Sequence, residues 1–277
     1  MTISFIIPAC DAEATLSRTL ESVLRQTEPN WEAIIVADDL KDYQRFLSSK
    51  GFTDPRLRFA STGRHRSGCH HARNIGFETV TGDYVTQLDA DDEITPHRLA
   101  ELLPLAQHYG AAADNLLMID DETHDEIGTV IDHASGTRLL SLQEFMTLNA
   151  PLVPLIRRDH CLPRVPGIEF SEDVIANIQL IDRIGHLPVT ASSTYIYYIR
   201  RGSMANSIAA SDKFERGYSD YINRLREGDG FGLTAENRLI ACEGLITKRK
   251  LNRDYTEAAK HESNLTFAQF IKRKHTV

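Results

Sequence analysis

The first 110 residues alternate short apolar runs with amphipathic segments, and this alternation constrains the fold more than any other feature. The apolar runs, which are typical of buried strands, are residues 3–7, 31–37, 56–60 and 83–88. Between the first two runs, leucine and valine recur at helical spacing, and residues 70–80 also have a helical pattern. Strands and helices that alternate at this length predict an α/β fold, with a mostly parallel sheet covered by helices on both faces.

Local signals predict where two of the helices begin. Asp11 is well placed to cap the helix after the first strand, because its carboxylate can accept hydrogen bonds from free N–H groups. Further along, Thr95 can cap a helix that Pro96 begins. Asp92 and Glu93 are then expected at the start of that helix, where its dipole favours negative charge.

The second half of the chain has a less regular pattern. Residues 115–120 and 128–132 are predicted to pair as strands, residues 172–185 to form a helix, and residues 194–203 to form a strand that runs into a basic turn. From about residue 211 the pattern is helical.

No internal repeat or low-complexity linker divides the sequence. We therefore expect one domain over residues 1–207, composed of a first half at 1–92 and a second half at 93–207. A helical C-terminal extension is expected over residues 208–277.

Charge and cysteine usage exclude several classes of protein. The net charge of −8 argues against a general nucleic-acid-binding protein, which needs a basic face. The four cysteines are far apart and form no Cys-x-x-Cys pair, so neither a zinc ribbon nor a disulfide framework is indicated. No stretch approaches the roughly 20 apolar residues of a membrane span. These features predict a cytoplasmic protein, at most peripheral on the inner face of a membrane.

The segment "LDADDE", residues 88–93, places four carboxylates directly after a strand-like run. Asp89 and Asp91 are separated by one residue, so on an extended backbone both side chains leave the same side. Two such carboxylates suit a hard divalent cation, Mn²⁺ or Mg²⁺, that keeps open positions for phosphate oxygens. The alternative is a solvated helix start without a metal.

Four segments follow predicted strands and should meet at one edge of the sheet, where ligands bind in folds of this kind. They are residues 8–11, Asp38–Asp39, the loop at 61–71 and the acidic cluster. Arg73 follows that loop near a helix start, where guanidinium and free N–H groups both favour phosphate.

The sequence resembles the family 2 glycosyltransferases. The resemblance rests on "FIIPACDAEATLSRTLESVLRQTEPNWEAIIVADD" and "GCHHARNIGFETVTGDYVTQLDADD", and it extends through "SEDVIANIQL" and "YYIRRGSMANS" to about residue 207. It implies a GT-A fold and an enzyme of the hexosyltransferase type that transfers a sugar, with inversion, from a nucleoside diphosphate sugar. A UDP-sugar is the favoured donor, and a saccharide or lipid-linked molecule is the expected acceptor, in the synthesis of polysaccharide, glycolipid or another envelope glycoconjugate.

The resemblance also implies roles for individual residues. Pro8, Ala9 and Asp11 would line the nucleoside, Asp39 would hydrogen-bond the base, and Arg73 would lie near the nucleotide. Asp89-Ala90-Asp91 would be the Asp-x-Asp metal motif. Asp173 would be the general base, with Glu172 as the alternative, since the two acids are adjacent.

The chain departs from the family pattern in four places. The first motif reads "PACDAE", where an aromatic residue and an asparagine are common, so the usual residue for stacking on the base is absent there. The usual Asp-Asp-Gly-Ser is "DDLK" here, so the turn after the second strand must be built without its glycine. Cys69, His70 and His71 precede "ARNIG", and because adjacent side chains at a helix start diverge, packing or a contact with the donor is expected rather than zinc. Arg200 and Arg201 replace a common histidine and are expected to clamp the diphosphate as a lid; the alternative is that they are solvated surface residues.

The C-terminal helices carry "KRK" twice, at 248–250 and 272–274, so contact with anionic lipid is one interpretation and solubilising charge another. An oligomer contact through Phe214, Tyr218 and Tyr221 is a third.

A nucleotidyltransferase is an alternative function, but residues 8–18 have neither the glycine nor the lysine of a phosphate loop. A catalytically silent, sugar-nucleotide-binding scaffold is another alternative.

Overall fold

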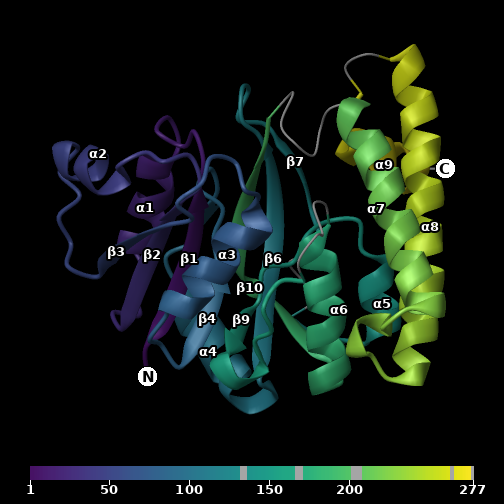
Figure 1. Ribbon diagram of the computed structural model, residues 1–277, viewed down its shortest axis with the longest axis horizontal. Coiled ribbons are helices and arrows are strands. Elements are labelled where there is room, and N and C mark those ends of the chain that lie inside the picture. The colour runs from purple at the N-terminus through teal and green to yellow at the C-terminus, as the bar shows by residue number, and fades with distance from the viewer. Residues whose placement is uncertain (132–135, 166–170, 201–207, 263–264, 276–277) are drawn as a thin grey trace.

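A mixed β-sheet forms the centre of the molecule, and helices cover both of its faces (Figure 1). The computed structural model describes residues 1–131, 136–165, 171–200, 208–262 and 265–275. The strands are β1 (Ile3–Ala9), β2 (Trp31–Ala37), β3 (Leu57–Ser61), β4 (Tyr84–Gln87), β5 (Glu93–Ile94), β6 (Ala111–Asp120), β7 (Glu126–Thr129), β8 (Thr137–Leu140), β9 (Leu155–Arg157) and β10 (Leu187–Ile199). The helices are α1 (Leu16–Leu24), α2 (Tyr43–Ser49), α3 (Cys69–Thr79), α4 (Arg98–Tyr109), α5 (Leu142–Thr147), α6 (Glu172–Ile184), α7 (Ile208–Glu227), α8 (Ala235–His261) and α9 (Phe267–His275).

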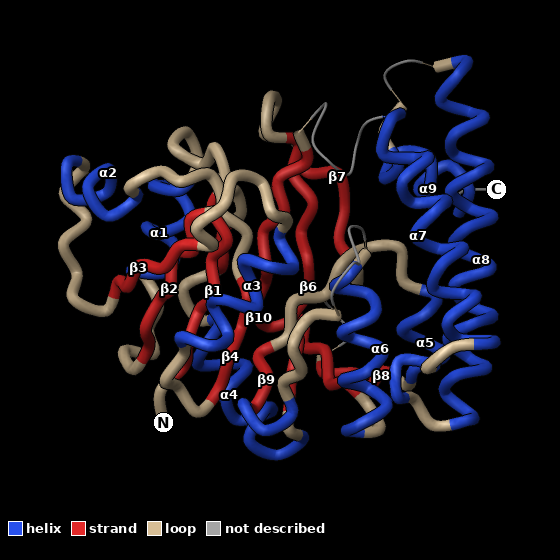
Figure 2. The backbone as a smooth tube through the Cα atoms, in the orientation of Figure 1, coloured by secondary structure: helices blue, strands red, loops and turns tan. Residues whose placement is uncertain are grey.

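The strand order is β3-β2-β1-β4-β9-β6-β10-β5, and β7 and β8 pair with β6 and β10. The first four strands run parallel, as the sequence predicts. Beyond β4 the sheet is mixed, because β9 is antiparallel to both of its neighbours whereas β6 and β10 are parallel. The predicted pairing of residues 115–120 with 128–132 is confirmed by the β6–β7 ladder. Figure 2 shows that the loops after β1, β2 and β3 gather at one edge of this sheet.

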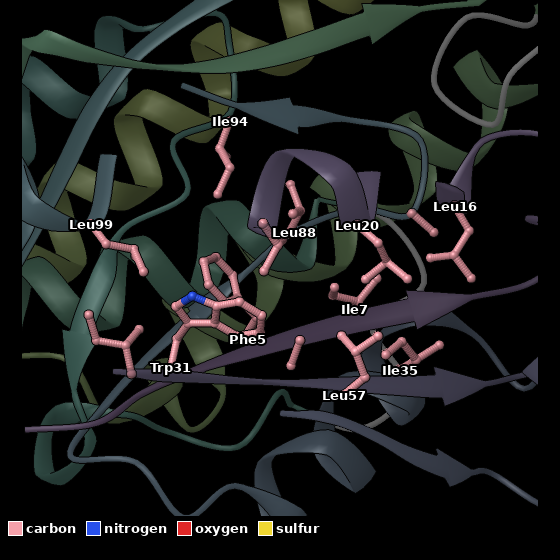
Figure 3. Packing of buried hydrophobic residues seen from close by; sticks show 14 of the residues in the cluster. Phe5, Ile7, Leu16, Leu20, Trp31, Ile35, Leu57, Leu88, Ile94 and Leu99 are labelled. Atoms are coloured by element: carbon pink, nitrogen blue, oxygen red, sulfur yellow. The ribbon is translucent and has the colours of Figure 1, made fainter. Parts of the chain in front are cut away.

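The first half has a core on one face of β1 and β2, where α1 and α4 pack (Figure 3). Phe5 and Trp31 meet there edge to face, with ring centroids 6.4 Å apart. Ile6 and Ile34 point to the opposite face, where α3 covers them. Because both faces are covered, the strands are apolar throughout, which is why the sequence pattern is so clear in this half.

The second half has its own core, which the C-terminal helices share. Helices α7 and α8 pack side by side and lie next to α5 and α6 (Figure 1). Ile181 of α6, Tyr221 of α7 and Leu245 of α8 are buried in this single cluster. Tyr221 therefore packs within its own chain, and the expectation that it contributes to an oligomer contact is wrong.

Both predicted helix starts are wrong. Helix α1 begins after Thr15 rather than after Asp11, whose backbone has a φ of 52° and whose side chain points to other partners. Helix α4 begins at Arg98, because the preceding segment pairs with β10 instead: β5 aligns with that strand, and the Thr95 N–H donates to the Thr194 carbonyl at 3.1 Å.

Candidate active site

The loop after β1 is held by Asp39, which follows β2. The Asp39 carboxylate accepts hydrogen bonds from the Asp11 N–H at 2.7 Å and from the Tyr43 hydroxyl at 2.8 Å. Burial favours the neutral acid, but these hydrogen bonds dominate and lower the pKa of Asp39. Its side chain is 0% exposed, so as placed it organises the loop, and contact with a base requires an exchange of hydrogen bonds.

The loop between β3 and α3 is held by Asp38 in a similar way. Its carboxylate accepts hydrogen bonds from the Thr62 hydroxyl at 2.8 Å and from the Gly68 N–H at 2.9 Å. The turn that follows Asp39 lacks the usual glycine, and Leu40 adopts the left-handed conformation there with a φ of 64°. Leu40 is exposed, and its left-handed backbone forms the turn in place of the glycine that is usual in the family.

Arg73 of α3 lies between two acids that are far apart in the sequence. Its guanidinium donates to Asp89 at 2.6 Å and forms an ion pair with Glu172. The Arg73 side chain is only 11% exposed, whereas that of Asp89 is 43% exposed and faces a cavity. Arg73 therefore joins the strand end of the first half to the helix start of the second.

Asp91 forms an ion pair with Arg200 at the end of β10. Arg200 also approaches Asp121, with 3.6 Å between its Nε and the carboxylate. Arg18 of α1 completes the group, since it donates to the Asp91 carbonyl at 2.6 Å and pairs with Asp121 at 2.8 Å. Burial and the neighbouring Asp89 charge raise the pKa of Asp91, so its charge is under-compensated despite Arg200.

Asp92 is buried beneath this group, and the sequence expectation that it lies at an exposed helix start is wrong. Its carboxylate accepts hydrogen bonds from the Tyr195 hydroxyl at 2.7 Å and from the Tyr198 N–H at 2.9 Å. Tyr195 in turn accepts a hydrogen bond from the Asp89 N–H at 3.2 Å. Glu93 lies in β5 and accepts a hydrogen bond from the Tyr198 hydroxyl.

Sequence reasoning therefore missed Tyr195 and Tyr198 as supports of the acidic segment. The available signal was that a tyrosine in a buried strand needs a partner for its hydroxyl group. Two such tyrosines on one predicted strand, in a chain with excess acids, indicate a link between that strand and the acidic cluster.

Glu172 and Asp173 begin helix α6 but differ in their surroundings. Glu172 is 4% exposed and lies between Arg73 and Arg164, whose Nε is 2.8 Å from its carboxylate. Burial would raise the pKa of Glu172, but the two arginines lower it overall. Asp173 forms no ion pair with any described residue, and burial together with the Glu172 charge raises its pKa. Of the two acids, Asp173 is the one available to accept a proton.

A cavity of about 430 Å³ opens between these acids and the C-terminal helices. Arg73, Asp89 and Asp173 line it from one side. The C-terminal helices also line it, with Phe214, Tyr218, Lys248, Tyr255 and Phe267. Arg73 in α3 and Asp89 after β4 both line the cavity, so it adjoins the strand-end loops.

The remaining predicted site residues lie mainly on the strand-end side. Ala9 and Ala90 are buried, Pro8 is half-buried, and Asp11 is exposed, where it pairs with Lys41 at 2.7 Å. His70 and His71 lie in the first turn of α3. Arg201 falls outside the described residues. Within the described ranges, no cluster of three or more histidine, cysteine or acidic side chains could hold a metal by itself.

Residues 4–147 match the model of glycosyl transferase family 2, which is more than half of the chain. The chain belongs to this family. This confirms the resemblance seen in the sequence and shows that the protein is a glycosyltransferase.

The curated relatives include one protein named for succinoglycan biosynthesis and one named as a glucosyltransferase. The succinoglycan biosynthesis protein ExoO of Rhizobium meliloti is 28% identical over 243 residues, which cover 78% of this chain and 69% of ExoO. The UDP-Glc:alpha-D-GlcNAc-diphosphoundecaprenol beta-1,3-glucosyltransferase WfgD of Escherichia coli is 37% identical over 90 residues, 32% of this chain and 35% of WfgD. The match to WfgD therefore spans only about a third of that relative.

Solved structures support the same fold. The S. aureus TarS 1–349 structure has a TM-score of 0.60 at 15% identity, and the match covers 95% of this chain and 92% of that one. TarS 1–349 in complex with UDP-GlcNAc has the same score at 14% identity and the same coverage of both chains. The GT-A fold expected of this glycosyltransferase is confirmed, including a helical C-terminal region. No helix of the described segments is long and apolar enough to cross a membrane.

Proposed function

We propose that this glycosyltransferase catalyses a metal-dependent, inverting transfer of a sugar from a nucleoside diphosphate sugar to an acceptor hydroxyl. One observation carries the proposal: Asp89 and Asp173, from opposite halves of the chain, line one cavity, and Asp173 alone of the acids at the start of α6 has no cationic partner among the described residues. A carboxylate that is not held in an ion pair, beside a proposed phosphate site, suits the role of base in this reaction.

The donor would bind across the loops that follow β1, β2 and β3. Pro8, Ala9 and Asp11 would line the nucleoside, and Asp39 would either contact the base or hold the Asp11 backbone against it. A UDP-sugar is favoured, because TarS, which shares the fold, has been solved with UDP and with UDP-GlcNAc.

Asp89 and Asp91 have the chemistry to hold Mn²⁺ or Mg²⁺, since hard cations prefer carboxylate oxygens. The raised pKa of Asp91 fits a cation site, because a cation would stabilise its charged form. Each carboxylate is paired with an arginine, so Arg73 and Arg200 would have to release them. When bound, the ion would supply positive charge for the departing diphosphate.

The chain's own residues would carry the remaining steps. Arg73 and Arg200, freed from their carboxylates, would bind diphosphate oxygens. Asp173 would take the proton of the acceptor hydroxyl while that oxygen forms a bond to the anomeric carbon, as the bond from that carbon to the diphosphate breaks. Attack from the face opposite the diphosphate would invert the anomeric centre. Residues 1–207 would form the catalytic domain, and residues 208–277 would form the acceptor-side wall.

A screen of UDP-, GDP- and dTDP-sugars for binding and for slow hydrolysis would test the proposal. It would be run with Mn²⁺, with Mg²⁺ and with a chelator. Metal-dependent binding of one nucleotide class, with release of the nucleoside diphosphate, is expected. If no nucleotide binds under any metal condition, the proposed function fails. Binding without hydrolysis, and without transfer to any acceptor, would favour the silent scaffold.

A further inference from the structure

The cavity between the proposed catalytic acids and the C-terminal helices contains one lysine that is held by a backbone carbonyl rather than by an ion pair. Lys248 of α8 is largely enclosed, and its ammonium group donates to the carbonyl of Leu148, the residue that follows α5. No carboxylate of the described residues lies within ion-pair distance of Lys248. Burying a cation outside a close ion pair is costly, so an anionic partner from outside the chain would relieve that cost.

The walls of the cavity suit a saccharide. The C-terminal helices contribute four aromatic side chains, and Phe214 and Tyr218 are stacked with ring centroids 6.2 Å apart. Flat rings of this kind pack against the apolar faces of sugars, and a few placed polar groups then fix the orientation. The Asn149 side chain also lines the cavity and forms no hydrogen bond with any described residue.

Asp173 lines the same cavity, so a molecule bound there would have a hydroxyl group near the proposed base. We propose that this cavity is the acceptor site and that Lys248 binds an anionic group of the acceptor, either a phosphate ester or a sugar carboxylate. The inference rests on the proposed function, since it names the substrate class of the same site.

The titration of Lys248 predicts that binding of an anion in the cavity depends on pH. Burial lowers the pKa of Lys248 to about 8, although Asp173 favours the charged form. The cation is therefore present below that pH and is lost above it, so binding of an anion should weaken as the pH rises through about 8. Tyr218 lines the same cavity, but burial raises its pKa to about 12, so it stays neutral over this range.

The test measures binding of three probes by ligand-observed NMR, with the donor site saturated by UDP and Mn²⁺. The probes are glucose 1-phosphate, methyl glucuronide and the neutral methyl glucoside. At least one charged probe should bind more tightly than the neutral one, and the preferred probe identifies the anion as phosphate or carboxylate. The preference should shrink as the pH rises from about 7 to about 9. Equal binding of all three, or no binding of either charged probe, would overturn the proposal.

Variants separate recognition of an anion from support of the fold. Lys248→Met should weaken binding of the charged probe at least about tenfold and leave the neutral probe unchanged. Lys250→Met, an exposed lysine on the same helix, is the matched control. Lys248→Arg should retain binding of the charged probe and remove its pH dependence. If Lys248→Arg loses that binding although it unfolds at the same temperature as the wild-type protein, Lys248 only holds Leu148 and the proposal is wrong. Loss of UDP binding in the wild-type protein would instead point to failure of the proposed function.

Discussion

The proposed donor side and the proposed acceptor side of the site differ in how their charges are compensated. On the donor side, Asp39, Asp89 and Asp91 each have hydrogen-bond or ion-pair partners within the chain. On the acceptor side, Asp173 and Lys248 both line the cavity without an ion pair among the described residues. The difference suggests that the donor side is organised before any ligand binds, whereas the charged groups of the acceptor side form their ion pairs or hydrogen bonds with the substrate.

Replacement of the proposed metal ligand should break the donor side most completely. Asp91→Ala removes a carboxylate group and leaves Arg200 with Asp121 alone, so metal-dependent donor affinity should fall at least about 100-fold. Calorimetric titration with UDP and Mn²⁺ measures this loss. Glu122→Gln changes an exposed acid next to Asp121 and serves as the control. Unchanged affinity in Asp91→Ala would remove Asp91 from the metal site.

The difference between Glu172 and Asp173 predicts unequal effects on the free energy of unfolding. Glu172→Gln leaves Arg73 and Arg164 enclosed without their shared counter-ion, so the free energy of unfolding should fall by about 3 kcal/mol. Asp173→Asn removes a carboxylate with no ion pair and should change stability by less than about 1 kcal/mol. Urea denaturation of both variants measures this. Equal losses would mean that the two acids have similar structural roles.

Arg200 should affect binding of the metal and binding of the donor in opposite directions. Arg200 is ion-paired with the Asp91 carboxylate, so Arg200→Ala should bind Mn²⁺ as tightly as the wild-type protein or more tightly. Loss of a diphosphate partner should weaken donor binding by about tenfold. Titrations with Mn²⁺ alone and with UDP in excess Mn²⁺ separate the two. Tighter binding of both ligands would show that Arg200 only blocks the carboxylate.

The smallest expected effect is on the pH profile of donor hydrolysis. Burial and the Glu172 charge raise the pKa of Asp173 above its ordinary value of 3.8. Because the carboxylate form is the base, activity should fall with decreasing pH at a higher pH than an ordinary aspartate would give. Initial rates of nucleoside diphosphate release across this range, in a protein that remains folded, test the sign. A profile that stays flat down to pH 3.8 would exclude Asp173 as the base.

The sequence predicted the first half of the fold better than the second. Strands buried on both faces give continuous apolar runs, so β1 to β4 were located to within a residue or two at most ends. The start of α4 was missed because β5 forms only through pairing with β10, a contact between residues about 100 positions apart. Local cap signals at Thr95 and Pro96 carry no information about such a partner.

The candidate site shows the same limit. Asp89, Asp91 and Asp173 were recognised as an ordered pattern along the chain. The arginines that distinguish Glu172 from Asp173 come from α3 and from the segment before α6, and Lys248 comes from α8. That these side chains lie close together can be recognised only when the fold is known, because they come from distant segments.

The most direct test of the account is to measure donor binding and donor turnover together in Asp173→Asn. The account predicts a dissociation constant for UDP-sugar and Mn²⁺ within about threefold of wild type, because Asp173 lies on the acceptor side. It also predicts that release of the nucleoside diphosphate falls at least about 100-fold, because no base remains to accept the proton. Retained release with unchanged binding would contradict the account and assign the proton to another residue.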